Sequence, residues 1–293
     1  MLAIERNNMK TIGFIDHSID EWHANNYPAW IHARAGQTFD VTLAWEEGPV
    51  PSGKRPLADW CRDQNVQPAR SLAEVVEQCD CIVVLSPDNM ERHEALADLP
   101  LRSGKPVYID KTFAPTRAAA QRMFAKAARH KTPLFTTSAL RYAVELREAL
   151  QGELAQHAAR LAVVDGANDF RRQYAVHAVE MLTMLLGLGA QRVMQVGTTT
   201  TPEIVVDYGD ARRGLLQFKR PAFKVVAESS AGTTLAFDVK QDFWAGADGF
   251  IDHLLRFFET GVSPVPPEQT LEIMRLLEVG ARAVDCPYTW LRL

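Results

Sequence analysis

A lysine and a histidine stand in sequence settings where each could act on a substrate. Lys111 follows the short apolar run 107–109, which a Gly-Lys-Pro turn precedes and a helical pattern follows. The run therefore predicts a buried strand that enters a helix. The carboxyl ends of strands in an α/β sheet border the crevice where ligands bind, so we expect Lys111 there. The alternative is a surface lysine that caps a loop.

His177 lies near the start of a second helical pattern and off its apolar stripe. That stripe consists of Ala178, Met181, Leu182 and Leu185. Gln173 precedes His177 by one turn, so the two side chains share a helix face. Imidazole titrates near neutral pH and can move a proton in catalysis, whereas an amide can only form hydrogen bonds. The alternative is a structural histidine.

The predicted helices and strands that must position these residues follow different patterns in the two halves of the chain. Short apolar runs alternate with helical patterns up to about residue 140, which predicts a doubly wound parallel sheet. These runs are 11–15, 39–45, 81–85, 107–109 and 133–138. Further apolar runs between 193 and 239 predict a second, largely antiparallel sheet, closed by helices at 250–259 and 269–284. We expect an α/β chain of two domains.

The segment around Lys111 resembles one from the glucose-fructose oxidoreductase/inositol dehydrogenase (Gfo/Idh/MocA) family. The sequence GKPVYIDKTFA, residues 104–114, is similar to the family's Glu-Lys-Pro segment. Asp110 stands for the glutamate and Thr112 for the proline. Lys111 matches the lysine that in the family approaches the nicotinamide and the substrate hydroxyl. The resemblance implies that Lys111 is catalytic and that Asp110 lies at the cofactor.

Two further segments carry the resemblance. Residues 174–187 are similar to the helix that the family's Asp-x-x-x-His motif opens. His177 matches the histidine of that motif, and Gln173 takes the place of its aspartate. The family's Thr-Pro-Asn segment, which packs against the nicotinamide ribose, is matched by Ser86, Pro87 and Asn89.

The resemblance implies a Rossmann dinucleotide-binding domain of residues 9–141 and an α+β domain of residues 142–293 for substrate binding and oligomerisation. Arg141 and Tyr142 fall beside the substrate in this comparison, although a salt-bridged structural arginine is equally consistent with the sequence. The implied reaction passes a hydride between NAD or NADP and a sugar, a polyol or a related hydroxyl compound. A homodimer or a larger homo-oligomer is expected as well.

The turn after the first predicted strand departs from the family. A dinucleotide-binding turn reads G-x-G-x-x-G, because the glycines allow a tight turn and a close approach of the pyrophosphate. Here Asp16, Ser18 and Glu21 replace the glycines, and Ile19 and Asp20 lie between them. Carboxylates suit a helix N-terminus but compete with a pyrophosphate for the same amides. The sequence therefore predicts that NAD(H) binds weakly or in an altered pose.

Glu46 ends the second predicted strand. An acid at this position would accept hydrogen bonds from the adenosine ribose hydroxyls and would disfavour a 2′-phosphate. Glu47 is the neighbouring alternative, and either residue could be a solvated strand end.

The first turn is also rich in groups that can bind a metal ion. These are Asp16, His17, Asp20, Glu21 and His23. Their spacing matches no known ligand set, so capping of the helix by ordinary polar residues is the simpler interpretation. We assign no metal site from the sequence.

Composition narrows the class of protein further. The 293 residues carry a formal net charge of −4 and contain no basic run, which disfavours nucleic acid as a partner. No apolar run is long enough to span a membrane, and the start lacks a signal-peptide core. The four scattered cysteines fit a reducing cytoplasm. Met9 is an alternative start, because the first strand begins just after it.

Two other functions are compatible with these patterns. The chain could be a family member that has lost ordinary dinucleotide binding and acts as a sugar-binding or scaffold protein. It could also be a metal-assisted lyase or hydrolase that uses the acidic first turn.

Overall fold

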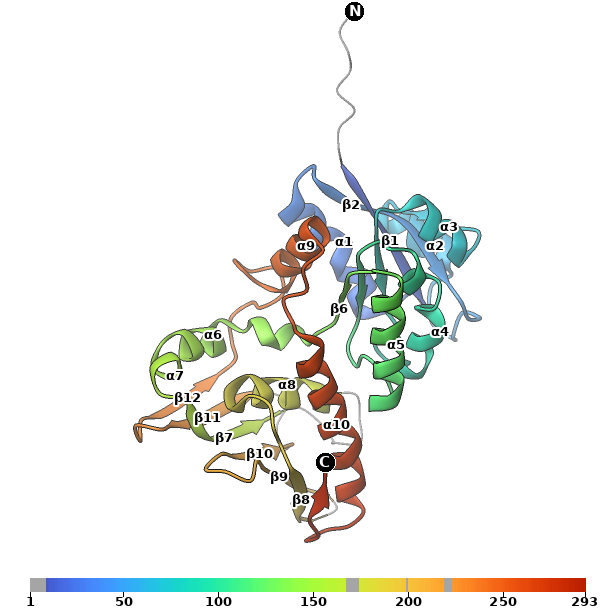
Figure 1. The fold of residues 1–293 in the computed structure, drawn as a ribbon. Coiled ribbons are helices and arrows are strands. Elements are labelled where there is room, and N and C mark those ends of the chain that lie inside the picture. Colours follow the sequence, from blue (N-terminus) through green and yellow to red (C-terminus); the bar gives the residue numbers. More distant parts are fainter. Residues whose placement is uncertain (1–8, 167–173, 199, 219–222) are drawn as a thin grey trace, which may run out of the picture. The chain divides into compact units, whose positions relative to one another are not determined.

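The computed structural model describes residues 9–166, 174–198, 200–218 and 223–293, and its chain divides into two compact units. Unit 1 comprises the chain up to Asp110 together with residues 122–136 and 251–264. Unit 2 comprises residues 111–121, 137–250 and 265–293. Each unit contains one β-sheet (Figure 1). The boundary after Arg141 that the sequence suggests stays a prediction.

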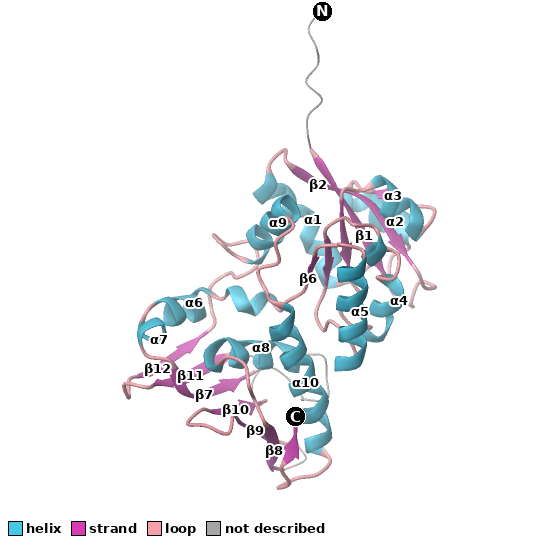
Figure 2. Ribbon diagram, in the orientation of Figure 1, coloured by secondary structure: helices cyan, strands magenta, loops and turns pink. Residues whose placement is uncertain are grey.

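Unit 1 is built on a six-stranded sheet with the order β3-β2-β1-β4-β5-β6. Its strands pair in parallel, and the order reverses between β1 and β4. Figure 2 labels β1, β2 and β6 of this sheet. The strand order is that of a Rossmann fold, in which ligands bind at the reversal point. The predicted doubly wound parallel sheet is thus confirmed. The strands are β1 Lys10–Asp16, β2 Phe39–Glu46, β3 Gln67–Pro68, β4 Cys81–Val84, β5 Val107–Ile109 and β6 Leu134–Phe135.

The central strands of this sheet are continuously apolar because helices cover both faces of a parallel sheet. All four residues of β4 are buried, as are the last five of β1. Gly13 of β1 lies so close to the helix above it that an added Cβ would meet a side-chain carbon of Val75 at 2.3 Å. A glycine at this position therefore lets the helix pack directly on the strand.

The helices that belong to the first part of the chain are mostly short. They are α1 Trp22–Ala35, α2 Leu57–Gln64, α3 Leu72–Gln78, α4 His93–Leu96 and α5 Arg117–Arg129, with 3-10 turns η1 Met90–Arg92 and η2 Pro100–Arg102. Helix α9, Phe250–Thr260, falls largely within unit 1 although it lies late in the sequence. Its Phe258 packs on Phe39 of β2, and its Phe257 packs on Phe135 of β6.

Unit 2 is built on a seven-stranded sheet with the order β12-β11-β7-β10-β9-β8-β13. The pair β7 and β10 is parallel, and the other pairs are antiparallel. The predicted second, largely antiparallel sheet is therefore confirmed. The strands are β7 Ala159–Asp165, β8 Arg192–Gly197, β9 Pro202–Asp207, β10 Arg213–Gln217, β11 Lys224–Ser229, β12 Thr234–Asp238 and β13 Leu291–Arg292.

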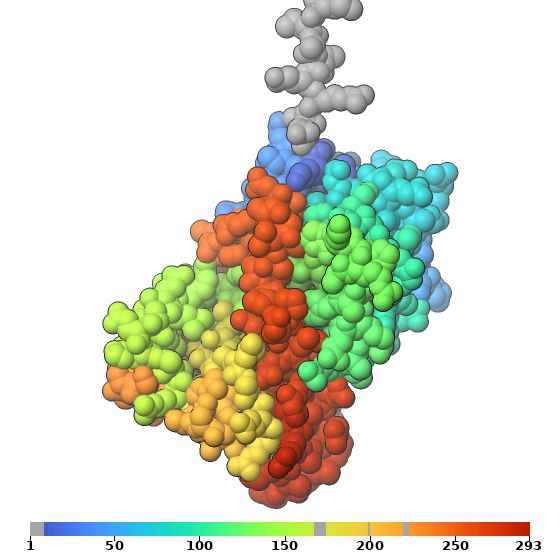
Figure 3. Space-filling model, in the orientation of Figure 1, coloured from blue at the N-terminus to red at the C-terminus, as the bar shows by residue number. Residues whose placement is uncertain are grey.

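Helices cover one face of this second sheet. The long helices are α8 Ala175–Leu186 and α10 Pro267–Val284, and the short ones are η3 Ala139–Tyr142, α6 Val144–Gln151 and α7 Glu153–Gln156. Gly214 of β10 allows α8 to approach, since an added Cβ would lie 2.7 Å from a methyl of Leu182. In Figure 3 the side chains of α10 fill the surface beside the strands of this unit.

Three details differ from the sequence-based expectations. Strand β6 has only two residues where a run of six was expected. Helix α8 is buried nearly all round, so His177 is buried as well and does not lie on an exposed face. Lys111 is only 7% exposed, whereas the strand end suggested a partly exposed side chain. In each case packing against distant parts of the chain, which periodicity does not report, decides the outcome.

Candidate functional site

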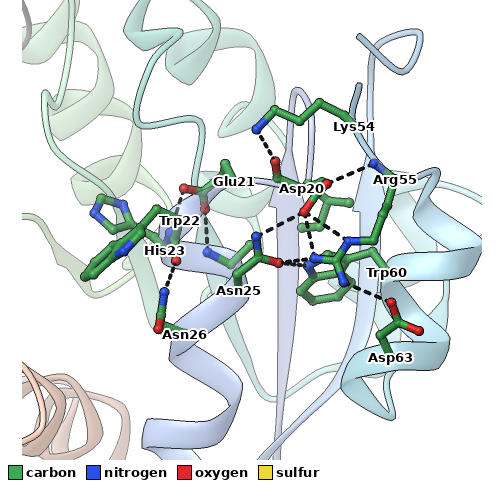
Figure 4. Close-up of polar contacts among 12 residues, drawn as sticks. Asp20, Glu21, Trp22, His23, Asn25, Asn26, Lys54, Arg55, Trp60 and Asp63 are labelled. Carbon is green, nitrogen blue, oxygen red and sulfur yellow. Dashed lines mark hydrogen bonds and ion pairs between the residues drawn. The ribbon is translucent and has the colours of Figure 1, made fainter. Parts of the chain in front are cut away.

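The turn between β1 and α1 is closed by the carboxylate of Glu21. Glu21 is the N-cap of α1, and its side chain accepts hydrogen bonds from the backbone N–H groups of His23, at 2.7 Å, and Ala24, at 2.5 Å (Figure 4). These amides have no partner within the helix itself. An acidic N-cap satisfies them and also interacts favourably with the helix dipole.

Other side chains of unit 1 take the remaining amides of this turn. Asp16 Oδ1 accepts from the N–H of Ser18 at 3.0 Å and from Ser86 Oγ at 2.8 Å. Ser86 Oγ in turn accepts from the N–H of His17 at 2.8 Å. Glu46 accepts from the N–H of Ile19 at 3.1 Å and from that of Leu57 at the same distance. Five of the residues expected at the cofactor thus form two hydrogen-bonded groups, Asp16 with Ser18 and Ser86, and Glu46 with Ile19.

Asp20 belongs to a separate polar cluster on the other side of the turn. Its carboxylate accepts from the guanidinium and the N–H of Arg55 and from the amide of Asn25, and its carbonyl accepts from Lys54 (Figure 4). Trp60 donates its indole N–H to Asn25 at 2.9 Å. The Arg55 guanidinium holds the pKa of Asp20 far below its ordinary value. Asp20 is therefore an ionised anchor that fixes the turn to α2.

Burial makes two of the carboxyl groups of the turn weak acids. Asp16 is 1% exposed, and burial raises its pKa from 3.8 to about 7. Burial also raises the pKa of Glu21 well above its ordinary value, and the nearby Asp16 and Asp110 charges raise it further. Asp16 Oδ2 is buried and has no hydrogen-bond partner among the described residues. These carboxyl groups lie at the reversal point of the sheet, where Asp16 and Asp110 raise the pKa of Glu21.

Asp110 follows β5 and lies at the same edge of the sheet. It is 1% exposed, its Oδ2 bonds His23 Nδ1, and its Oδ1 accepts from the hydroxyl of Tyr108 at 3.2 Å. The ring of His23 also stacks on that of Tyr27, with centroids 5.4 Å apart. Asp110 is thus part of the packed interior of unit 1, and its place at the cofactor stays a prediction.

The loop after β4 contains the other residues expected near the cofactor. Pro87 is buried, and Asn89 donates to Glu91 at 3.4 Å. His93 lies 3.1 Å from the carbonyl oxygen of Ser86 through its Nε2. Ser86 itself has φ +66°, a left-handed conformation that its two side-chain hydrogen bonds help to hold. This loop is therefore tied to the first turn.

The first turn as it stands does not fit the pyrophosphate of a nicotinamide dinucleotide. Such a linker binds to unoccupied amides at a helix N-terminus, approached closely over glycines. In this chain Glu21 already binds the amides of His23 and Ala24, and Asp16 and Glu46 bind those of Ser18 and Ile19.

The metal-ion interpretation of the turn is not favoured either. His17 Nδ1 pairs with Glu47 Oε2 at 3.0 Å, and Glu47 also binds Arg92, whereas His23 pairs with Asp110. The two histidines therefore serve different acids. Within the part of the chain that the structure describes, no group of three or more histidine, cysteine or acidic side chains could hold a metal ion.

In unit 2, His177 is held by a serine that the sequence did not single out. Ser138 Oγ lies 2.6 Å from His177 Nδ1, and both residues are buried. Ser138 Oγ also accepts from the N–H of Leu140 at 3.2 Å. A hydroxyl can donate to a ring nitrogen or accept from it, so this bond persists in either tautomer of the imidazole. It fixes the orientation of the ring and directs Nε2 away from Ser138.

A buried ion pair supports the same serine. Glu180 lies one turn after His177 on α8 and is 2% exposed. Its carboxylate accepts from the N–H of Ser138 at 2.7 Å, from Arg141 Nε at 2.6 Å and from the hydroxyl of Thr137. Arg141 Nη2 is buried and has no hydrogen-bond partner among the described residues. The arginine is thus a structural partner of Glu180 and also presents one unused donor.

Tyr174 brings Lys111 and His177 into one neighbourhood. The ammonium of Lys111 lies 5.7 Å from the centroid of the Tyr174 ring, and the His177 ring centroid lies 5.6 Å from it. Phe223 borders the other side of His177 at 5.7 Å. Tyr174 is 45% exposed, so this group reaches the surface of unit 2. A cation, an imidazole and an aromatic face side by side can hold and deprotonate a hydroxyl compound.

Tyr142, predicted to contact the substrate, does not join this group. Tyr142 is 3% exposed and packs against Phe250, with ring centroids 6.2 Å apart. Gln173 lies outside the described residues. Ser138, Glu180 and Tyr174 were not assigned to the site from the sequence. Only the spacing of His177 and Glu180 on one helix face could have indicated one of them.

A segment within the first half of the chain matches a known family model. Residues 28–138 match the family described as "Oxidoreductase family, NAD-binding Rossmann fold" (GFO_IDH_MocA). The match begins within α1, after the acidic turn. The class of protein is therefore an oxidoreductase with a Rossmann domain followed by an α+β unit. The match confirms the resemblance to the Gfo/Idh/MocA family that the segment at Lys111 indicated, since that segment lies within the matched residues.

Solved structures with the same fold share little sequence with this chain. GenD2 from gentamicin A biosynthesis, in complex with NAD, has a TM-score of 0.79 and 12% identity and covers 100% of this chain and 99% of its own. Scyllo-inositol dehydrogenase from Lactobacillus casei has a TM-score of 0.77 and 12% identity, with 98% of both chains covered. The WlbA dehydrogenase from Bordetella pertussis, in complex with NADH and UDP-GlcNAcA, has a TM-score of 0.72 and 14% identity, with 97% and 99% covered. No curated protein matches the chain.

Proposed function

We propose that the protein is a nicotinamide-dependent oxidoreductase that acts on a hydroxyl group of a sugar, a polyol or a related compound. The group formed by Lys111, Tyr174 and His177 is the observation that carries this proposal. Lys111 orients and polarises the substrate oxygen. His177 moves the proton of the hydroxyl through Nε2, while Ser138 holds the other ring nitrogen. The family match and the dehydrogenases that share the fold support the reaction class.

The substrate is expected to lie against Tyr174. An exposed aromatic ring offers an apolar face for the C–H groups of a sugar or polyol ring, and Arg141 Nη2 supplies a hydrogen-bond donor in the same unit. The UDP-GlcNAcA that is bound in the WlbA complex is consistent with this choice. The preference for NAD or NADP depends on the side chains that contact the adenosine ribose. Glu46, the acid expected there, already accepts hydrogen bonds from the N–H groups of Ile19 and Leu57.

Steady-state turnover of a panel of sugars, polyols and their nucleotide-linked forms, with NAD and NADP, tests the proposal. Lys111→Met keeps most of the volume of this buried side chain, and His177→Asn removes the proton-transferring ring. Each is expected to lower turnover a hundredfold or more, since a positioned polar group typically supplies ~3–4 kcal/mol of transition-state stabilisation. Near-wild-type turnover of either variant would remove that residue from the mechanism, and no turnover of any hydroxyl compound would refute the function.

A further inference from the structure

Backbone N–H groups in the acidic turn after β1 already donate hydrogen bonds within the chain. The N–H groups of His17, Ser18, Ile19, His23 and Ala24 each donate to a side-chain oxygen of unit 1. The N–H of Glu21 donates to the carbonyl of Ile19 at 2.8 Å. These amides, of the kind that a Rossmann turn normally offers to a phosphate, are thus satisfied within the chain.

Glu21 has a special position among these acceptors. Its two carboxylate oxygens bind two successive amides at the start of α1, which is how an anion binds at a helix N-terminus. The neighbouring Asp20 carries the same charge but is bound to Arg55 and Asn25 away from these amides. Glu21 alone occupies the place that a pyrophosphate would take.

We propose that the carboxyl group of Glu21 is a built-in occupant of the N-terminus of α1, and that a nicotinamide dinucleotide must displace this group to bind. The inference rests on the proposed function, and it adds that the affinity of this chain for the cofactor is set by competition with its own side chain. Removal of Glu21 should therefore strengthen binding, whereas a residue that contacted the cofactor favourably would weaken binding when removed.

Displacement of the Glu21 side chain costs hydrogen bonds, but the side chain has a path to solvent. The carboxyl group would lose its two hydrogen bonds to the backbone N–H groups of His23 and Ala24. Asp16 remains close by and would face the incoming pyrophosphate. Glu21 is not fully buried and precedes Trp22, which is 52% exposed, so its side chain can rotate to solvent without crossing the core. The turn can thus open at Glu21 while Asp16 stays in place.

Titration calorimetry on the full chain tests this competition with NADH, NADPH and ADP-ribose. ADP-ribose keeps the pyrophosphate and lacks the nicotinamide, and adenosine, which has no phosphate, serves as the ligand control. We expect Glu21→Ala to bind ADP-ribose and the preferred dinucleotide at least about tenfold more tightly than the wild type. Glu21→Gln should show a smaller gain, because its neutral oxygen still accepts from the amides. Adenosine binding should not change.

A matched control variant distinguishes removal of the Glu21 side chain from the amides of α1 from a change in the net charge of the protein. Glu77→Gln changes the charge by the same amount at an exposed position of α3 and should leave every affinity within about twofold of the wild type. Circular dichroism verifies that each variant is folded, and Glu21→Gln, which keeps a capping oxygen, decides the matter if Glu21→Ala is unstable.

Two results would overturn the inference in distinguishable ways. Wild-type protein that binds NADH as tightly as both Glu21 variants would show that Glu21 does not compete, while the proposed function would stand. No binding of any dinucleotide or of ADP-ribose by the wild type or by the variants would refute both the competition and the nicotinamide-dependent function.

Discussion

His177 illustrates how much of a residue's role depends on a neighbour that is distant in sequence. Ser138, 39 residues earlier, bonds its Nδ1, and Glu180 holds the backbone of that serine. Imidazole alone can rotate and exchange tautomers, so without this bond Nε2 would have no fixed direction. The histidine motif supplies the chemical group, and the residues of η3 and of the segment before it supply its geometry.

Asp16 gives a prediction on pH dependence. Burial raises its pKa to about 7 in the folded chain, from 3.8. Between these values the folded state holds a proton that the unfolded chain releases, so this residue's contribution to stability is lost as the pH rises through 7. Asp16→Asn, which cannot ionise, should therefore match the wild type near pH 4 and exceed it at pH 8 by at most about 4 kcal/mol. Urea unfolding at both pH values measures this, and an equal difference at the two would contradict it.

At the scale of elements, α8 is the helix that positions the candidate site of unit 2. It is buried nearly all round, and it places both His177 and Glu180 against η3 and the residues before it. A carboxylate inside such a helix is tolerated because Arg141, Thr137 and the Ser138 amide satisfy it. The ion pair fixes the register between α8 and η3.

The ion pair between α8 and η3 should be strongly coupled. Glu180→Ala leaves Arg141 as a buried charge without its carboxylate and is expected to lower the free energy of unfolding by about 3–5 kcal/mol. Arg141→Leu should lower the free energy of unfolding by a similar amount, because it leaves Glu180 as a buried charge without its arginine. The double variant should lower it by much less than the sum of the two single effects, because no unpaired charge remains. Denaturant unfolding of the four proteins measures the coupling, and additive losses would mean that the pair does not act as a unit.

At the scale of the whole molecule, the second sheet has one face that its helices leave open. A row of apolar side chains crosses six of its strands on that face. In register order the row is Ala236, Val226, Val163, Leu215, Val205 and Met194. Val226 is 39% exposed, and the row is bordered on one side by the polar row that contains Glu228 and Arg213. An apolar band with a polar border is typical of an interface between protein chains.

We expect two copies of the chain to meet through this row. Leu215→Lys would place a charge in the centre of the interface and should convert a dimer into a monomer at micromolar concentration, because an unpaired buried charge is costly. Val262→Lys, at a 71% exposed position of unit 1, is the control and should leave the mass unchanged. Light scattering or sedimentation decides the result. A wild-type chain that is monomeric throughout would refute the expected homo-oligomer.

The sequence by itself determined the class of fold and the chemical groups. Alternating apolar runs and helical patterns were sufficient for the parallel and the antiparallel sheet, because periodicity is a local property of the chain. The segments at Lys111 and His177 were sufficient for the family resemblance, and the match over residues 28–138 supports it at Lys111. The loss of the glycines at Asp16, Ser18 and Glu21 was equally visible.

Only the tertiary structure decided how these groups are used. No pattern in the sequence could show that Glu21 binds the amides of His23 and Ala24, or that Ser138 bonds His177. Hydrogen bonds and burial depend on which distant segments meet, and the pKa of Asp16 rises only because the assembled unit excludes water from it. The residues fix which chemistry is available, and the packing of remote elements fixes which side chains face one another.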